Sequence, residues 1–189
     1  MPNWCWNHLE VHGDEKQLQE FVEKSTTNIE SNGCTSDEFS FEGTLPRGDR
    51  KDWYEWSLEN WGTKWDACEP HINHNDIDYF AVSFESAWSP PIAWIENIMK
   101  DFPNLSFTLE YEEPGMCFGG RLFAQHERVF EDNHWELDPA SECCEAEVSF
   151  DEDGFHGEAK CLVCGEETET ISINVADIKP AKIKVNESK

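Results

Sequence analysis

Large aromatic side chains and an extreme acidic excess occur together in this chain, and the combination restricts what it can fold into. Nine tryptophans and twelve phenylalanines accompany 40 acidic and 14 basic residues, for a formal charge of −26 over 189 residues. Chains this acidic are often disordered because they lack apolar groups to bury. This chain does not lack them, so we expect a folded protein with a strongly negative surface.

A strongly negative surface repels phosphates and lipid headgroups and attracts basic partners. Direct nucleic acid binding is not expected, because phosphate contacts require clustered lysine and arginine. No apolar run of about 18 residues predicts a membrane span, and the first residues carry no basic stretch followed by an apolar one that would indicate a secretory signal. The sequence therefore predicts a cytoplasmic protein that binds a protein with a basic surface.

Alternating and helical hydrophobic spacing predicts the order β-α-β-insert-β-α-β in the first part of the chain. This order predicts an α+β protein with the ferredoxin-like βαββαβ arrangement, in which two helices cover one face of a four-stranded antiparallel sheet. The expected strands span residues 4–13, 39–41, 77–84 and 105–111, and the expected helices span residues 15–25, 50–59 and 92–102, the second of these lying in the insert.

Composition divides the chain into three expected parts: a ferredoxin-like domain at 1–125 with an aromatic-rich insertion at 46–76, an acidic appendage of β-hairpins at 126–178, and a mobile basic tail at 179–189. Residues 110–170 contain 18 acidic residues against three basic ones. We expect partner binding in this acidic part of the chain, with the candidate residues Glu145, Glu147, Asp151, Glu152 and Asp153.

The eight cysteines are expected to be thiols or metal ligands in a reducing cytosol rather than disulfides. Cys161 and Cys164 are separated by two residues and followed by a glycine, a spacing typical of one half of a structural zinc site. The other half should lie about 15–20 residues away, where Cys143 and Cys144 are adjacent rather than spaced, with His156 as a substitute ligand. A zinc-ribbon-like appendage and free thiols fit this pattern equally well.

The aromatic insertion contains a second candidate site. Trp61 and Trp65 offer stacking faces, Lys64 offers a cation, and Asp66 and Trp88 complete a platform on which a small ligand or nucleotide would stack. The alternative is that both indoles pack the insertion onto the sheet.

A compact group of Cys68, His71 and His74 has metal-ligand types, but the asparagines around it favour an exposed polar loop. The chain contains no nucleophile elbow and no phosphate-binding glycine loop, so the sequence assigns no catalytic residue.

Four motifs in a fixed order resemble a known family. They are Asn3-Trp4-Cys5, Trp61-Gly62-Thr63-Lys64-Trp65-Asp66-Ala67, Ala87-Trp88-Ser89-Pro90-Pro91, and Glu110-Tyr111 followed by Pro114-Gly115-Met116-Cys117-Phe118-Gly119-Gly120. Together they are similar to the ferredoxin-like domain of Api-type proteins from tailed phages and conjugative plasmids, over about residues 1–125. The resemblance implies a ferredoxin-like fold without an iron–sulfur cluster and a mobile genetic element as source; it brings no established activity.

Acidity and the implied source together suggest an acidic protein-binding module. Its carboxylates would stand in for the phosphates of a nucleic acid, which would make it an inhibitor of a host defence complex of the restriction or CRISPR type. The alternative function is a small-ligand or nucleotide-binding protein, enzymatic or not, that uses residues 61–66.

The zinc hypothesis predicts about one zinc per chain in protein purified without chelator, and loss of that zinc in the variant Cys164→Ser. Elemental analysis measures the metal. A chain with no zinc and freely titrating thiols at Cys161 and Cys164 would contradict the hypothesis.

Overall fold

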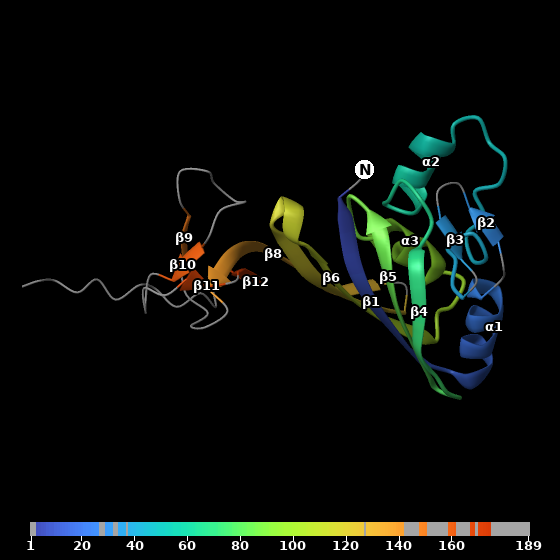
Figure 1. The fold of residues 1–189 in the computed structure, drawn as a ribbon. Coiled ribbons are helices and arrows are strands. Elements are labelled where there is room, and N and C mark those ends of the chain that lie inside the picture. Colours follow the sequence, from blue (N-terminus) through green and yellow to red (C-terminus); the bar gives the residue numbers. More distant parts are fainter. Residues whose placement is uncertain are drawn as a thin grey trace, which may run out of the picture. The chain divides into compact units, whose positions relative to one another are not determined.

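The computed structural model in Figure 1 describes residues 3–26, 29–31, 34–36, 38–126, 128–141, 148–150, 159–161, 167–168 and 170–174. The chain divides into two compact units, Met1–His134 and Trp135–Lys189. The first unit carries the predicted α+β core.

An antiparallel sheet with β1 (Trp4–Gly13) at its centre forms the first unit. β1 pairs with β5 (Tyr79–Ala87) on one side and with β6 (Leu105–Glu113) on the other. β4 (Cys68–Asn75) extends the sheet beyond β5, and β7 (Phe118–Gln125) extends it beyond β6. The order β6-β1-β5-β4 is that of the split βαβ fold, which confirms the predicted ferredoxin-like class.

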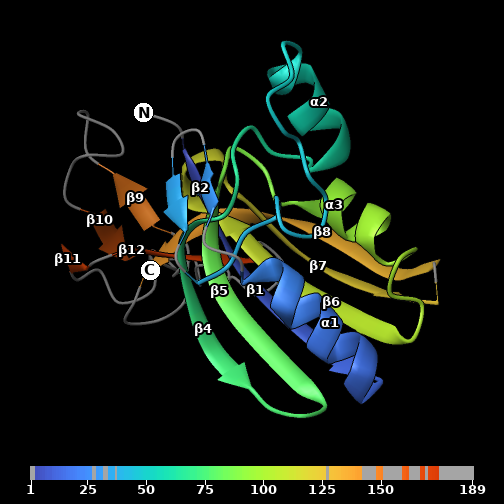
Figure 2. The same cartoon turned by 90° about the vertical axis from the view of Figure 1, so that its right-hand side faces the viewer.

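Both helices of the ferredoxin-like core, α1 (Glu15–Ser25) and α3 (Ile92–Ile98), lie on the same face of the sheet (Figures 1 and 2). α1 begins where predicted, because the Asp14 carboxylate accepts a hydrogen bond of 3.1 Å from the Gln17 amide and caps the first turn. Leu18 and Phe21 then point into the core from α1. α3 follows Pro91 and ends at Ile98, four residues before the predicted end at 102.

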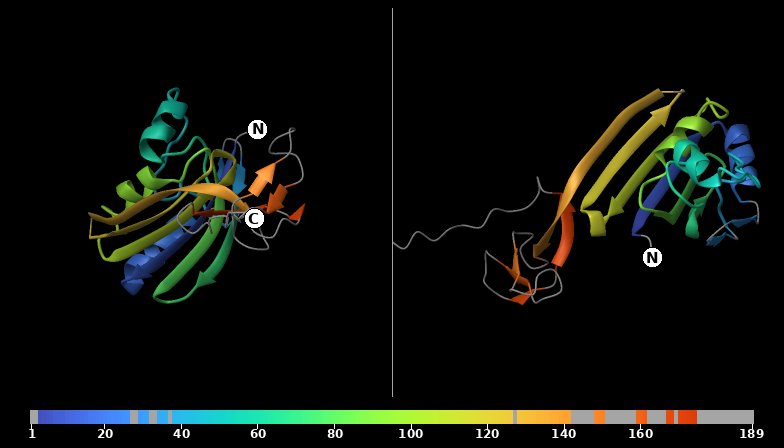
Figure 3. Two further views of the ribbon diagram at one scale, coloured as in Figure 1. Left: turned by 90° about the vertical axis from the view of Figure 1, so that its left-hand side faces the viewer. Right: turned by 90° about the horizontal axis from the view of Figure 1, so that it is seen from above.

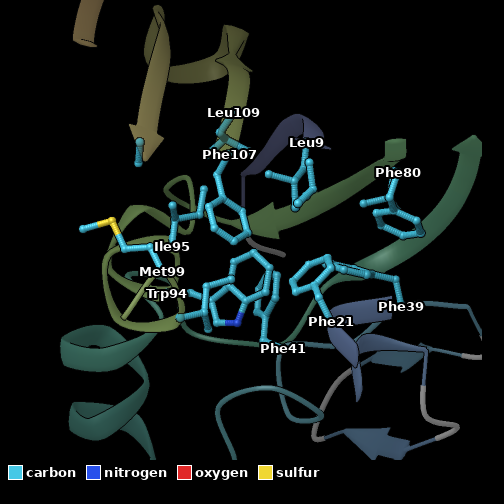
Figure 4. Packing of buried hydrophobic residues seen from close by; sticks show 14 of the residues in the cluster. Leu9, Phe21, Phe39, Phe41, Phe80, Trp94, Ile95, Met99, Phe107 and Leu109 are labelled. Carbon is cyan, nitrogen blue, oxygen red and sulfur yellow. The ribbon is translucent and has the colours of Figure 1, made fainter. Parts of the chain in front are cut away.

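Aromatic rings fill the space between the helices and the sheet (Figure 4). Phe21 of α1 contacts Phe80 of β5, Phe107 of β6 and Trp94 of α3, at ring-centroid distances of 6.0, 5.8 and 6.3 Å. Burying such rings contributes most of the favourable folding energy that a highly charged chain needs. The aromatic core therefore explains how so acidic a chain folds.

The segment after α1 departs from prediction. A short hairpin of β2 (Ile29–Ser31) and β3 (Cys34–Ser36) follows the helix. Residues 39–41 then form no strand, contrary to the prediction. Phe39 and Phe41 are nevertheless fully buried. The chain that follows them lies close to the end of α1: a Cβ atom on Gly43 would lie only 1.7 Å from the Lys24 carbonyl oxygen.

The Asp66 carboxylate holds this buried segment in place. It accepts hydrogen bonds from the Ser40 hydroxyl and the Phe41 amide, each at 2.6 Å, and from the Ala67 amide at 2.7 Å. Burial raises the pKa of this carboxyl, against the effect of the hydrogen bonds. Asp66 therefore joins the insertion, which includes α2 (Trp53–Asn60), to the segment that closes the core.

Residues 68–75 form strand β4 rather than the polar loop favoured by their composition. Pairing with β5 is interrupted by register shifts, which explains why the sequence shows no clear alternation there. Cys68 is disulfide-bonded, so the expectation that all eight cysteines are thiols or metal ligands is wrong at this position. The bond also removes Cys68 from the hypothetical group with His71 and His74.

After β7 the chain forms a further strand, β8 (Arg128–Ser141). In the second unit, the end of β8 pairs with β12 (Thr170–Asn174). A separate small sheet joins β9 (Val148–Phe150), β10 (Ala159–Cys161) and β11 (Glu167–Thr168). In this small sheet β10 pairs antiparallel with both β9 and β11.

We predict that Asp66→Asn lowers the free energy of unfolding by about 2 kcal/mol, because an amide cannot accept all the hydrogen bonds that the carboxylate accepts. Chemical denaturation measures this, with the exposed Asp76→Asn as control. The raised pKa means that the folded state binds more protons than the unfolded state above the ordinary value of 3.8. Part of the wild-type stability is therefore lost as pH rises from there through the raised pKa, and Asp66→Asn should remove that part of the slope.

Candidate protein-binding surface

Strand β1 divides the first unit into two chemically different faces. Cys5, Asn7, Leu9 and Val11 are buried on the helix side. The alternate residues point the other way because successive side chains of a strand alternate. No helix among the described residues of the first unit covers that second face, seen in Figure 3, left. We call it the open face; its β1 residues are Trp4, Trp6, His8, Glu10 and His12.

Trp6 lies at the centre of an acidic row on the open face. It is opposite Glu85 of β5 on one side and Glu112 of β6 on the other, and directly opposite residues share a face of the sheet. The two glutamates are therefore two strand spacings apart, about 10 Å. The Trp6 side chain remains 45% exposed between them.

Aromatic contacts extend from Trp6 in both directions along the strand. The Trp6 indole stacks on the His8 ring, with centroids 6.1 Å apart and planes within 7°. One row toward the start of β1, Trp4 contacts Trp65 at 5.9 Å, and the Lys64 ammonium lies 4.6 Å from the Trp65 ring. A line of aromatic rings thus follows β1 across the open face.

Carboxylates dominate the charge of this face. Its acidic residues are Glu10, Glu85, Glu110 and Glu112, and the one basic residue that the register places among them is Arg121, which lies 3.6 Å from Glu110. Partial burial, and then the Glu110 charge, raise the pKa of Glu112. Partial burial, and then Glu69, raise the pKa of Glu85. Among the described residues, no lysine or arginine lies within ion-pair distance of either carboxylate beside Trp6.

Ser83, His8 and Glu10 also lie close together on this face, but they do not form a catalytic triad. The Ser83 hydroxyl donates its proton to the Asn73 side-chain oxygen at 2.8 Å. His8 Nδ1, 3.0 Å from the same hydroxyl oxygen, therefore donates to it and cannot receive its proton. A general base requires the opposite direction, so this arrangement does not activate Ser83.

The far end of the open face is polar and aromatic. Tyr79 lies between the His12 and His74 rings at 4.4 and 4.8 Å, and its hydroxyl donates to Glu10 at 2.9 Å. Burial, then the hydrogen bond and charge of Glu10, raise the Tyr79 pKa. These contacts keep the Glu10 carboxylate in place.

Near this end, a hollow of about 250 Å³ opens between α1 and the turn from β4 to β5. Leu18, Val22 and Ile77 provide apolar walls, and Glu15, Glu23 and Asp76 provide carboxylates. A cationic side chain with an apolar stem matches this lining.

The structure separates the residues proposed for the Trp61 platform. Trp61 is fully buried, and its indole N–H donates to the Leu45 carbonyl oxygen at 3.0 Å. Asp66 is fully buried in the contacts described above. Neither presents a surface to a ligand. Lys64 and Trp65 are half-buried, and Trp88 is 45% exposed with a left-handed φ of 73°.

The other predicted residues fall largely beyond the part of the chain that the structure describes. This applies to the acidic candidates and to Cys143, Cys144 and Cys164, whereas Cys161 is the last residue of β10. Among the described residues, no group of three or more side chains could hold a metal ion. No helix there combines the length and apolar character needed to cross a bilayer.

The ferredoxin-like domain of Api92-like proteins matches residues 60–173 of the chain. The chain belongs to this family. The match starts later and ends later than the resemblance noted over residues 1–125. The chain is also similar to the Api92 protein of Yersinia pseudotuberculosis, with 9% identity over 74% of this chain and 100% of that one, at a TM-score of 0.49. Comparison with curated proteins found no match.

The open face was missed at the sequence level, although its signal was visible. The strand at 4–13 was predicted, and period-two alternation already places Trp4, Trp6 and His8 on one side of it. The flanking glutamates required strand register, which the sequence alone did not provide.

We predict that Glu85→Gln and Glu112→Gln, separately and together, raise the denaturation midpoint at pH 7. A raised pKa in the folded state means that folding disfavours the ionised carboxylate. Replacing it with a neutral amide should therefore stabilise the fold at a pH where the carboxylate is ionised. At pH 4, where both glutamates are largely protonated, the gain should disappear. Thermal denaturation at the two pH values checks this against Glu96→Gln on α3; a loss of stability at pH 7 would contradict it.

Proposed function

We propose that this protein is an acidic binding module whose open face receives a basic segment of a partner protein. The observation that carries the proposal is the 45% exposed Trp6 between Glu85 and Glu112. Large exposed aromatic side chains are costly to leave in water, and tryptophan is enriched among the residues that dominate binding energies.

An arginine or lysine of the partner fits this arrangement chemically. A cation stacked on the Trp6 indole would lie about 5 Å, one strand spacing, from the positions of both glutamates. It would gain a cation–π contact and two carboxylate neighbours. Arginine fits best, because its flat, weakly hydrated guanidinium stacks on rings and hydrogen-bonds carboxylates at its edges.

Charge argues against a nucleic acid as the occupant of this face. Aromatic sheet faces bind single strands by stacking bases, but they do so within a positive field. Here four carboxylates, Glu10, Glu85, Glu110 and Glu112, accompany one arginine. Phosphates would be repelled.

A finer proposal is that the basic partner normally binds DNA or RNA and that this protein occupies its surface as a nucleic acid mimic. The −26 charge supports it, as does the phage and plasmid source implied by the resemblance. A host restriction or CRISPR-type complex is the kind of partner this proposal names. The acidic candidates Glu145, Glu147, Asp151, Glu152 and Asp153, in an appendage braced by zinc, would add further negative charge for this role.

The test uses the full chain and a fluorescent peptide of eight arginines, with binding measured by anisotropy in low and high salt. Trp6→Ala should weaken binding by about tenfold, in line with about 1–2 kcal/mol for a partly desolvated cation–π contact. The combined Glu85→Gln and Glu112→Gln change should weaken it further and flatten the salt dependence.

Tyr54→Ala is the matched control, because Tyr54 is a 44% exposed aromatic residue on α2 rather than on the open face. A chain of this charge also binds polyarginine nonspecifically. The difference in peptide affinity between Trp6→Ala and Tyr54→Ala therefore tests whether Trp6 itself takes part in binding. Equal affinities of Trp6→Ala and Tyr54→Ala would overturn the proposal.

A further inference from the structure

Arg47 is a buried cation for which the described part of the chain provides no acidic partner. Its residue is 8% exposed. Its Nε is buried without a hydrogen-bond partner, and Nη1 makes one long hydrogen bond of 3.4 Å to the Ser57 hydroxyl oxygen. No carboxylate in the part of the chain that the structure describes lies within ion-pair distance of this guanidinium.

In the described part of the chain, the Ser57 hydroxyl is the one acceptor within hydrogen-bond distance of the Arg47 guanidinium. Two indoles flank the guanidinium, Trp61 at 4.9 Å and Trp53 at 5.6 Å from the ring centroids. The nearby Glu42 carboxylate accepts from the backbone amides of Arg47 and Gly48 at 3.1 and 2.8 Å. That carboxylate thus fixes the backbone of the loop rather than the charge of the side chain.

Two more exposed arginines of the first unit do have carboxylate partners. Arg50 forms two hydrogen bonds with Asp52, at 2.9 and 3.2 Å, and stacks on Trp56 at 4.9 Å. Arg121 lies 3.6 Å from Glu110. In a chain with 40 acidic residues, the most buried arginine of the described part has no carboxylate there within ion-pair distance. Burying an unpaired charge is strongly unfavourable.

We propose that Arg47 binds an oxyanion, the phosphate or carboxylate group of a small ligand, through the free edge of its guanidinium. Arginine recognises both groups through parallel N–H donors, and the planar fork is already held between two indoles. The bound oxyanion would supply the charge compensation that the chain itself withholds. This site lies in the insertion and is independent of the open face.

A second cation is placed to assist. The Trp53 ring contacts Tyr54 at 5.8 Å, and the Lys64 ammonium lies 6.0 Å from the Tyr54 ring. Lys64 likewise has no carboxylate within ion-pair distance in the described part. Arg47 and Lys64 thus flank one aromatic pair, which gives an anionic ligand with a ring a surface on which to stack.

The experiment follows the Nε–Hε resonance of Arg47 by NMR in the full-length protein during titration with inorganic phosphate, acetate or chloride at constant ionic strength. A saturable shift with phosphate alone assigns a phosphate site, and a saturable shift with acetate assigns a carboxylate site. Arg50, stacked on an indole but paired with Asp52, is the internal control and should not move.

Arg47→Lys keeps the charge and removes the fork, so it should weaken anion binding at least tenfold, as reported by a second resonance, the Trp61 indole N–H. Should that variant fail to fold, the wild-type titration decides alone. No saturable shift of Arg47, or a parallel shift of Arg50, overturns the proposal. Failure of peptide binding at Trp6 would leave this result unaffected, because Trp6, Glu85 and Glu112 take no part in the Arg47 site.

Discussion

The buried Asp66 carboxylate is the interaction on which the first unit depends. It is anchored just before β4, and its partners belong to the segment that delivers Phe39 and Phe41 to the core. Without it, the helix side of the sheet would lose two of its largest rings, and the insertion that carries α2 would lose its attachment. A buried carboxyl group, satisfied by backbone and hydroxyl donors, therefore organises a fold whose other acidic side chains mostly face water.

That organisation concentrates apolar packing on one side of the sheet and leaves the other without a helix among the described residues of the first unit. The carboxylates beside Trp6 are not placed for stability, because their neighbours and partial burial oppose their ionisation. Ionisable groups that lower the stability of the fold are commonly found at functional sites. The open face and the Arg47 site then form two chemically opposite regions, one suited to cations and one to anions.

Local pattern predicted the parts of the fold that obey it. The β1 alternation, the Asp14 cap and the apolar spacing of α1 and α3 all lead to the structure found. Prediction failed where tertiary contacts override local preference: β4 is pinned by β5 despite its asparagines, and Phe39 and Phe41 are buried by Asp66 without forming a strand. Trp61 and Asp66 looked like ligand groups because sequence shows residue type and not burial. Arg47 was missed because a lone arginine carries no motif.

The central position of β1 has an evolutionary consequence. Its even-numbered side chains, such as Trp6 and His8, meet the outside, and its odd-numbered ones, such as Cys5 and Leu9, meet the core. An insertion or deletion of one residue in this strand would exchange the two sets, pushing an indole inward and exposing leucine. Substitutions on the open face therefore leave the strand register intact, whereas a change of length is tolerated only in the connections outside the strand.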